Sequence, residues 1–145
     1  MIDALDKVIL SELQADSRIS WRELGDRVGL GATATADRVR RLIDLGIIAR
    51  FTTVIDATAL GIGLRAIVDV RLSPGTPGEL FEQRLRAHSE VQSACHLTGP
   101  FDFMVQVACP DVARLDQMLR GWKSDGLVGE SNTRILLAEI DLTES

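Results

Sequence analysis

The chain has 145 residues, a formal net charge of −5 and a hydrophobic fraction of 46%. This length holds one ordinary domain or two small ones with modest cores, so we expect oligomerisation to add stability. Because no apolar run approaches the roughly 20 residues that span a bilayer and the N-terminus lacks a signal-peptide pattern, we expect a cytoplasmic protein without a membrane segment.

The negative charge lies in the second part of the chain. Up to Arg50, eight basic residues balance eight acidic ones, so the remaining residues carry the whole net charge. A neutral N-terminal part with clustered arginines can hold a phosphate backbone, which would repel the acidic remainder.

The cysteines and histidines form a poor metal set. Cys95 and Cys109 lie outside any close Cys/His spacing that binds zinc, and the two histidines are His88 and His96. We expect buried thiols in a reducing compartment, and neither a metal nor a cofactor.

Three helices are predicted in the first 45 residues. Residues 5–13 place apolar side chains at helical spacing behind a capping Asp3, and Ser20-Trp21-Arg22-Glu23 is a capping box that opens a short second helix. Gly29-Leu30-Gly31 predicts the turn to a third helix over residues 32–45, which ends before Gly46. Its inward stripe is predicted to contain Thr35, Val39, Leu42 and Ile43.

The next segment, over residues 47–55, is rich in branched and aromatic side chains and predicts a strand that serves as a wing or linker. From Leu64 onward the pattern alternates, which predicts a strand over residues 64–72. The capping box Thr76-Pro77-Gly78-Glu79, with proline in the first helical position, opens a helix with Phe81, Leu85 and His88 inward.

The remaining elements complete a second domain. Strands are predicted over residues 91–97 and 101–108, joined through Gly99-Pro100, and a last strand over residues 132–140. The helix between them starts at Pro110-Asp111, and its predicted inward residues are Val112, Leu115, Leu119 and Trp122. The order strand, helix, strand, strand, helix, strand is the split βαβ arrangement, an antiparallel sheet with both helices on one face. The fold class is therefore α+β, with domains at residues 1–50 and 64–145 and a linker strand and hinge over residues 51–63.

The open face of this sheet is unusually apolar. Ile67 and Met104 lie among its outward residues, and the last predicted strand is apolar on both sides. Because such a face should be polar, we infer that a second copy covers it. Scattered apolar surface without function is the alternative.

The three N-terminal helices describe a helix-turn-helix, in which the N-terminal residues of the third helix lie nearest the base edges of duplex DNA. The residues at this tip are Thr33, Ala34 and Asp37. Asp37 could accept a hydrogen bond from a cytosine amino group or orient an arginine. The predicted phosphate contacts are Arg38, Arg40 and Arg41, together with Ser20, Trp21 and Arg22 where the second helix opens. A merely solvated helical face is the alternative for the arginine cluster.

Short motifs recur in a characteristic order and spacing over nearly the whole chain. In the first half they are Leu5-Asp6, Ile9-Leu10, Arg18-Ile19-Ser20, Glu23-Leu24, Val28-Gly29-Leu30, Arg38-Val39-Arg40-Arg41-Leu42, Gly46-Ile47-Ile48 and Leu60-Gly61. In the second half they are Val91, Thr98-Gly99-Pro100-Phe101-Asp102 and Asn132-Thr133-Arg134. In this order and spacing the chain resembles the Lrp/AsnC (feast/famine) family of regulators. Two positions depart from the family: Gly31 replaces a capping serine and Thr35 an aliphatic residue, which predicts a slightly looser start of the third helix.

The resemblance implies an N-terminal winged helix-turn-helix, a C-terminal domain of ferredoxin-like fold, and dimers that pair through their sheets and assemble into tetramers or octamers. It also implies an amino acid or related metabolite as effector. The implied effector-binding residues are Leu97, Thr98, Gly99, Pro100, Phe101, Asp102 and Thr133. Gly99 would let backbone approach the ligand and Asp102 could hold an α-ammonium group. A simple hairpin turn capped by Asp102 is the alternative.

We therefore predict a transcription regulator that binds double-stranded DNA and responds to a small metabolite, without catalysis. A metabolite sensor that has lost DNA binding is one alternative. Another is an enzyme like the sirohaem decarboxylases, which the same two-domain fold resembles. Their activity rests on histidine, tyrosine and arginine residues, and this chain has no tyrosine and only His96 as an acid/base group in the corresponding strand.

Overall fold

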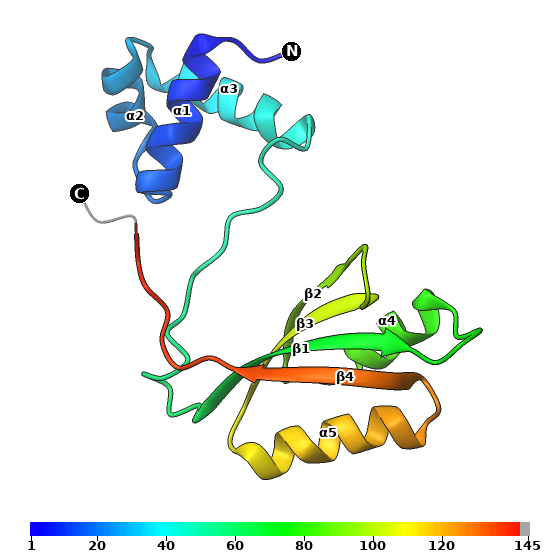
Figure 1. The fold of residues 1–145 in the computed structure, drawn as a ribbon. Coiled ribbons are helices and arrows are strands. Elements are labelled where there is room, and N and C mark those ends of the chain that lie inside the picture. Colours follow the sequence, from blue (N-terminus) through cyan, green and yellow to red (C-terminus); the bar gives the residue numbers. More distant parts are fainter. Residues whose placement is uncertain (143–145) are drawn as a thin grey trace. The chain divides into compact units, whose positions relative to one another are not determined.

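The computed structural model describes residues 1–142 and divides the chain into two compact units, Met1–Val54 and a second that begins at Ile55 (Figure 1). Each unit has its own hydrophobic cluster. No helix within residues 1–142 is both long and apolar enough to cross a membrane.

The N-terminal unit consists of α1 (Ala4–Ala15), α2 (Trp21–Val28) and α3 (Ala32–Asp44), which confirms the three predicted helices. Its core residues come from all three helices and the turn after α1; they are Ile9, Leu13, Ile19, Leu24, Val39 and Leu42. Ile43 was wrongly placed in this core, because its side chain is 43% exposed whereas Thr35, Val39 and Leu42 form the buried stripe.

The helix caps differ in detail from the prediction. At α1, Asp3 accepts from the Asp6 N–H at 2.8 Å and the Asp6 carboxylate accepts from the Asp3 N–H at 3.1 Å, which completes a capping box. At α2, the Ser20 hydroxyl accepts from the Glu23 N–H at 3.1 Å, but the Glu23 carboxylate pairs with Arg27 instead of returning to Ser20. One half of the predicted box therefore forms.

Gly25 allows α2 and α3 to approach closely, which the sequence did not reveal. A Cβ at this position would lie 2.4 Å from the Leu30 carbonyl oxygen and 2.9 Å from the Thr35 Oγ1. Thr35 is fully buried, and its hydroxyl donates to the Gly31 carbonyl oxygen at 2.9 Å. This bond satisfies the buried hydroxyl and ties the first turn of α3, where Gly31 provides no side-chain cap.

The predicted linker strand does not form. Between Asp44 and Leu64 the chain has neither helix nor strand, and residues 57–61 make turns closed by Leu60 N–H to Ala57 O at 3.1 Å. Val54 is 94% exposed. A strand needs a neighbouring backbone, and this segment has no strand partner within residues 1–142.

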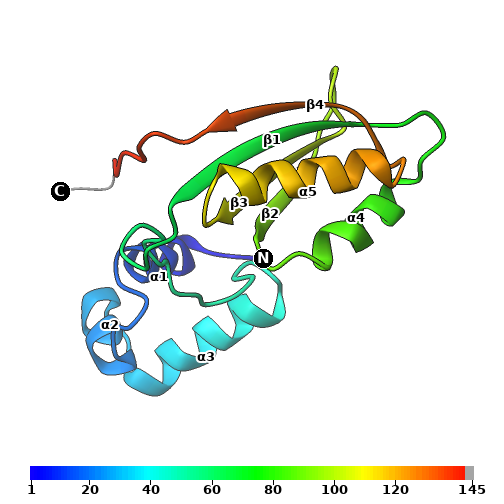
Figure 2. The same ribbon diagram turned by 90° about the horizontal axis from the view of Figure 1, so that it is seen from below.

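The second unit contains β1 (Leu64–Leu72), α4 (Gly78–Arg86), β2 (Val91–His96), β3 (Phe103–Cys109), α5 (Val112–Ser124) and β4 (Val128–Ile135). The strands pair antiparallel in the order β2-β3-β1-β4, which confirms the split βαβ arrangement. Figure 2 shows α4 and α5 on the same face of the sheet. Phe81 of α4 and Trp122 of α5 pack between helices and sheet, with ring centroids 5.4 Å apart.

Three predictions in this unit are wrong in detail. Val112 is 59% exposed, and Met118 is buried instead. The Thr76 box does not form, because Pro77 is the N-cap of α4 and no side chain caps it. The last strand starts at Val128 and ends at Ile135, since β1 sets its length: the Leu136 N–H donates to Arg65 O, near the point where β1 begins.

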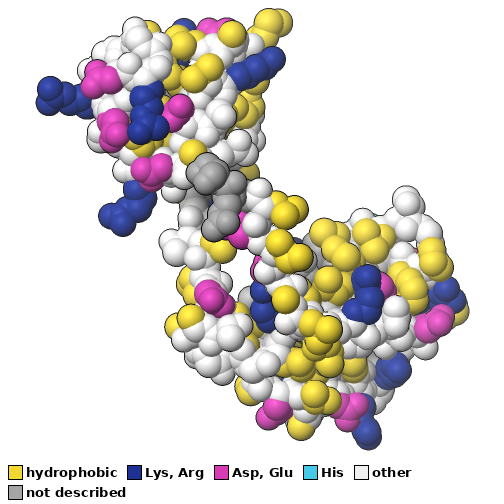
Figure 3. Space-filling view, turned by 60° about the vertical axis from the view of Figure 1, so that its left-hand side comes forward, with side chains coloured by type: hydrophobic (Ala, Val, Ile, Leu, Met, Phe, Trp, Pro, Cys, Tyr) yellow, Lys and Arg dark blue, Asp and Glu magenta, His cyan; other side chains and the backbone are white. Residues whose placement is uncertain are grey.

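The face of the sheet away from the helices carries the predicted apolar residues. Ile67 and Met104 are half-buried there, and Leu137, Ile140 and Leu142 beyond β4 are exposed. Figure 3 shows hydrophobic side chains grouped on the visible side of this unit. The prediction of two buried thiols is wrong for Cys95, which is exposed on the edge strand β2, whereas Cys109 is buried.

Candidate nucleic-acid interface and ligand loop

The helix pair α2 and α3 has the geometry of a helix-turn-helix. Gly29 ends α2 in the left-handed region at φ 77°, and the Leu30 N–H donates to the Gly25 carbonyl oxygen at 2.9 Å. The short turn and the missing side chain at Gly25 fix α3 against α2. The opposite surface of α3 is left to solvent.

The tip of α3 is exposed at each predicted base-contacting residue, namely Thr33, Ala34 and Asp37. Asp37 pairs with Arg40 at 2.8 Å, one turn along the helix. Asp37 therefore pairs with an arginine of its own helix in the free chain, and both of its predicted roles at DNA stay predictions.

Arg38 differs from the other arginines of α3 because it is held by the fold. Its side chain is 30% exposed, and Nη1 donates to both Asp3 oxygens at 2.8 and 2.9 Å and to Asp6 Oδ1 at 3.0 Å. The hydrogen bond from Arg38 is the main cause that lowers the pKa of Asp3 to about 2. Arg38 thus joins α3 to the first turn of α1.

Arg41 is restrained but more open. Its side chain is half exposed, with Nη2 donating to the Met1 carbonyl oxygen at 2.5 Å and Nη1 lying 3.7 Å from Asp6 Oδ2. These contacts leave part of the guanidinium facing solvent.

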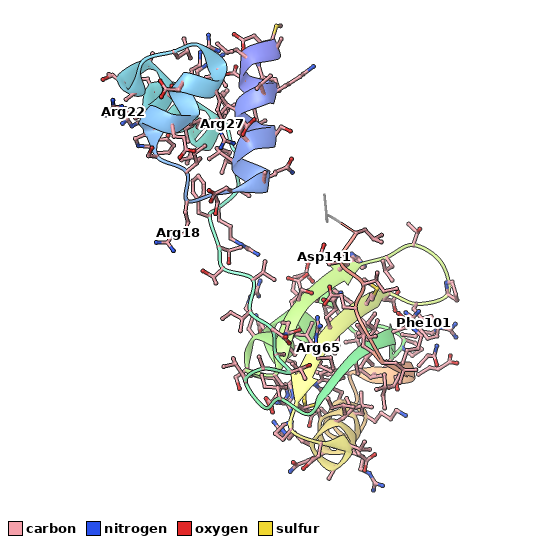
Figure 4. The ribbon with its side chains drawn as sticks, turned by 90° about the vertical axis from the view of Figure 1, so that its left-hand side faces the viewer. Arg18, Arg22, Arg27, Arg65, Phe101 and Asp141 are labelled. Atoms are coloured by element: carbon pink, nitrogen blue, oxygen red, sulfur yellow. The ribbon has the colours of Figure 1, made fainter. Side chains whose placement is uncertain are left out.

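The start of α2 offers a further basic group. Trp21 is 41% exposed, and Arg22 is exposed with no ion pair within the described chain. Figure 4 shows Arg18 and Arg22 extending outward, whereas Arg27 turns back toward α1, where it pairs with Glu12 at 2.6 Å. Arg18 was not among the predicted DNA contacts; it follows the break after α1, and its charge alone was the available signal.

The predicted ligand loop connects β2 to β3. The Leu97 N–H donates to the Asp102 carbonyl oxygen at 2.8 Å, and Gly99 has φ 103°, which only glycine adopts freely. Asp102 ties this loop to β1: its N–H donates to Val70 O and its Oδ2 accepts from the Leu72 N–H, both at 2.8 Å. Its carboxylate therefore has a structural role whether or not it also binds a ligand.

Arg71 is a loop neighbour that the sequence analysis missed. Its Nε donates to the Pro100 carbonyl oxygen at 2.7 Å, and its guanidinium lies 5.7 Å from the centroid of the Phe101 ring. Figure 4 places Phe101 in this loop, at the edge of the unit. The sequence near Arg71 gave no signal for this contact, because the contact arises only when β1 pairs with β3 and brings the loop beside the end of β1.

Within residues 1–142, no hydrogen bond joins the Thr133 side chain to this loop. Its partner in the sheet register is Val68, in the middle of β1, whereas Asp102 binds near the end of that strand. Since register partners share a face, Thr133 lies on the same side as the buried Val68, toward the helices.

A depression of about 490 Å³ lies between α4 and β2, and His88, Ser93, His96 and Phe103 contribute to its lining. None of the predicted loop residues lines it, although His96 and Phe103 flank that loop. Burial lowers the pKa of His88. Within residues 1–142, no group of three or more His, Cys, Asp or Glu side chains is placed to hold a metal ion.

Both units match known domain families. Residues 2–43 match the AsnC-type helix-turn-helix domain, and residues 65–144 match the Lrp/AsnC ligand binding domain. The chain belongs to the Lrp/AsnC family. It is 35% identical to the leucine-responsive regulatory protein of Escherichia coli K12, over 99% of this chain and 88% of that protein. It is 33% identical to the HTH-type transcriptional regulator AldR of Mycobacterium tuberculosis, over 96% of this chain and 79% of that protein.

Solved structures agree with this assignment. A transcriptional regulator of Neisseria meningitidis, determined as a complex with L-Met, aligns with a TM-score of 0.88 at 25% identity over 97% of this chain and 93% of that one. This Lrp/AsnC chain is therefore a DNA-binding transcription regulator with a helix-turn-helix unit and a ligand-binding unit.

Proposed function

We propose that α3 reads duplex DNA through Thr33, Ala34 and Asp37, while arginines of α2 and α3 hold the phosphate backbone. The observation that carries this proposal is the packing of α3 against α2 through Gly25, which buries Thr35 and leaves Thr33, Ala34 and Asp37 exposed.

Exposure separates the arginines by role. Among residues 1–142, Arg22 has no ion pair and Arg40 pairs with its exposed neighbour Asp37 alone. Arg41 is half exposed, so these three arginines are suited to phosphate. The backbone donors at the start of α2, beside Ser20 and Trp21, supply a further phosphate contact. Phosphate binding by Arg38 would have to replace its three hydrogen bonds to carboxylates, so we assign Arg38 to the support of α3.

The test is fluorescence anisotropy on the DNA upstream of the protein's own gene, measured over a range of salt concentrations. Arg22→Gln and Arg40→Gln should each weaken binding and reduce the salt slope by about 0.9, the value for one lost phosphate contact on duplex DNA. Arg120→Gln is the matched control, because Arg120 is exposed on α5 and pairs there with Asp116 of the same helix. No binding by the unmodified protein at low salt would refute the DNA-binding proposal and favour the metabolite-sensor alternative.

We propose an amino acid or a related small metabolite as the effector, bound at the loop over residues 97–102. The match to a ligand binding domain and the L-Met complex of the Neisseria meningitidis regulator support this class of ligand. Gly99 has no side chain, so a ligand can approach the loop backbone at this position. Asp102 supplies a carboxylate for an α-ammonium group.

A panel of the twenty amino acids in thermal unfolding tests the effector. At least one should raise the melting temperature, because a ligand that binds only the folded state stabilises it. Asp102→Ala should abolish that shift, while Asp116→Ala, which removes an exposed carboxylate of α5, should preserve it. The effector proposal fails if none of the twenty shifts the unmodified protein.

We further propose that a second copy covers the open sheet face, giving a dimer and then tetramers or octamers, and that the chain acts without catalysis. The half-buried Ile67 and Met104 support the dimer. Ile67→Glu should shift the sedimentation velocity distribution toward monomer, and an unchanged distribution would contradict the proposed face. The decarboxylase alternative would require turnover of a sirohaem-type substrate, which an absorbance assay detects.

A further inference from the structure

A cluster of charges joins the first turn of α1 to α3, and we call it the α1–α3 charge cluster. Its members are Asp3, Asp6, Arg38, Arg41 and the Met1 carbonyl group. Asp6 lies at its centre, with only 1% of its side chain exposed. Burial of a carboxylate is unfavourable unless hydrogen bonds and opposite charges compensate it, so a charged Asp6 depends on the donors and cations around it.

Asp6 contacts both arginines at once. Its Oδ1 accepts from Arg38 Nη1 at 3.0 Å, and its Oδ2 accepts from the Asp3 N–H at 3.1 Å and lies 3.7 Å from Arg41 Nη1. Because residues 38 and 41 are three positions apart on α3, their side chains lie on neighbouring parts of one face. One buried carboxylate thus pairs with two of the three arginines of the helix, Arg38 and Arg41.

The two arginines differ in how much of the side chain remains exposed for DNA. Arg38 is bound by Asp3 as well, which leaves it 30% exposed, whereas Arg41 is 50% exposed. Arg41 is held from two sides, by Asp6 and by the Met1 carbonyl oxygen. A long side chain fixed before binding loses less conformational freedom when it meets a ligand.

We propose that Asp6 is a positioning residue of the DNA interface: its carboxylate fixes Arg41 in the orientation that contacts a DNA phosphate. Arg38 compensates the buried charge and so keeps Asp6 in place. The inference rests on the proposed DNA-binding role of α3 and adds a residue that has no exposed surface for DNA.

The test is a double-mutant cycle of Asp6→Asn and Arg41→Gln, with DNA affinity and salt slope measured by anisotropy. Circular dichroism must first show that each variant is folded at the assay temperature. In the unmodified background we expect Arg41→Gln to weaken binding about tenfold, and in the Asp6→Asn background less than about threefold, which is a coupling typical of contacting residues. Asp6→Asn alone should also reduce the salt slope, because the Arg41 contact is partly lost.

Two control variants separate positioning from a merely structural effect. Arg40→Gln should weaken binding equally in both backgrounds, because Arg40 pairs with Asp37 and not with Asp6. Asp26→Asn removes the same charge from an exposed position on α2 and should leave the Arg41→Gln effect unchanged. Additive effects of Asp6→Asn and Arg41→Gln would overturn the proposal, as would an equal loss of the Arg40 and Arg41 effects.

If Asp6→Asn does not fold, the mobility of the arginine side chains in the unmodified protein tests whether Arg41 is fixed before DNA binds. Nitrogen-15 relaxation of the guanidinium groups without DNA should show Arg41 rigid and the exposed Arg22 mobile, and equal mobility would overturn the proposal. If the unmodified protein does not bind DNA, the proposed function itself fails. Normal DNA binding with additive variants would reject only the role of Asp6.

Discussion

Gly25→Ala should destabilise the N-terminal unit and leave the second unit intact. The added Cβ would lie 2.4 Å from the Leu30 carbonyl oxygen and 2.9 Å from Thr35 Oγ1. Ordinary carbon–oxygen contacts are no closer than about 3.3 Å, so α2 and the following turn must separate by about 1 Å. The turn cannot move alone, because the Leu30 N–H is bonded to the Gly25 carbonyl oxygen at 2.9 Å.

Two opposing effects set the size of the change. Overpacking of this kind costs about 1–3 kcal/mol, and the backbone atom at the closest contact favours the upper part of that range. Alanine recovers up to about 1 kcal/mol because it has a better helix propensity than glycine. We therefore expect the free energy of unfolding of the N-terminal unit to fall by about 1–2 kcal/mol and DNA affinity to fall with it.

The two tryptophans allow each unit to be followed separately. Trp21 lies in α2 and Trp122 in α5, and the chain contains two tryptophans in total. After labelling with 5-fluorotryptophan, fluorine NMR over a urea titration should show an earlier transition for Trp21 and an unchanged one for Trp122. Gly31→Ala is the matched control: a Cβ there meets no atom within 4 Å, so only the weaker N-cap preference of alanine acts, and the loss should stay below that of Gly25→Ala. An unshifted Trp21 transition in Gly25→Ala would refute the close-packing argument.

Further changes have equally specific outcomes. Phe81→Ala should lower the unfolding free energy of the second unit by about 3–5 kcal/mol, because Phe81 is fully buried against Phe103 and Trp122. The urea transition of Trp122 measures this loss, and a loss below about 1 kcal/mol would contradict the packing. Burial, and then the charge of Arg84, lower the pKa of His88 below its usual 6.5, so the unfolded chain takes up the proton first as the pH falls. The Trp122 midpoint should be highest above pH 6.5 and decline from there to pH 5.5, and His88→Gln should flatten that decline. Asp102→Asn should speed hydrogen exchange of the Leu72 amide, whose acceptor is the Asp102 carboxylate, while amides in the middle of β1 stay protected.

Sequence periodicity predicted most of the fold because a helix buries side chains with a period of about 3.6 residues, whereas a strand buries every second side chain. The stripe through Val39 and Leu42 and the alternation through Val68 and Val70 correspond directly to the two cores. The predicted position of the last strand is wrong because Val128–Ile135 is mostly polar, whereas the apolar residues that follow lie beyond the sheet pairing, which ends with the bond from the Leu136 N–H to Arg65 O. Pairing with β1, and not hydrophobicity, sets that strand.

The candidate site was predictable as a set of exposed residues, but the partners of those residues were not. Arg38 and Arg40 look alike in the sequence, yet Arg38 binds Asp3, 35 positions away. No local period encodes such a contact, because it depends on how α1 packs against α3. For the same reason Arg71 was missed beside Pro100 and Phe101.

The two hydrophobic cores have no residue in common: one is centred on Leu24 and Val39, the other on Phe81 and Trp122. A substitution within one core therefore changes no packing contact in the other core. Over evolutionary time, such a chain can change the DNA sequence that it recognises without altering the ligand that it senses. The reverse also holds, and a lineage can thus connect an existing metabolic signal to a new set of genes through substitutions confined to the surface of one helix.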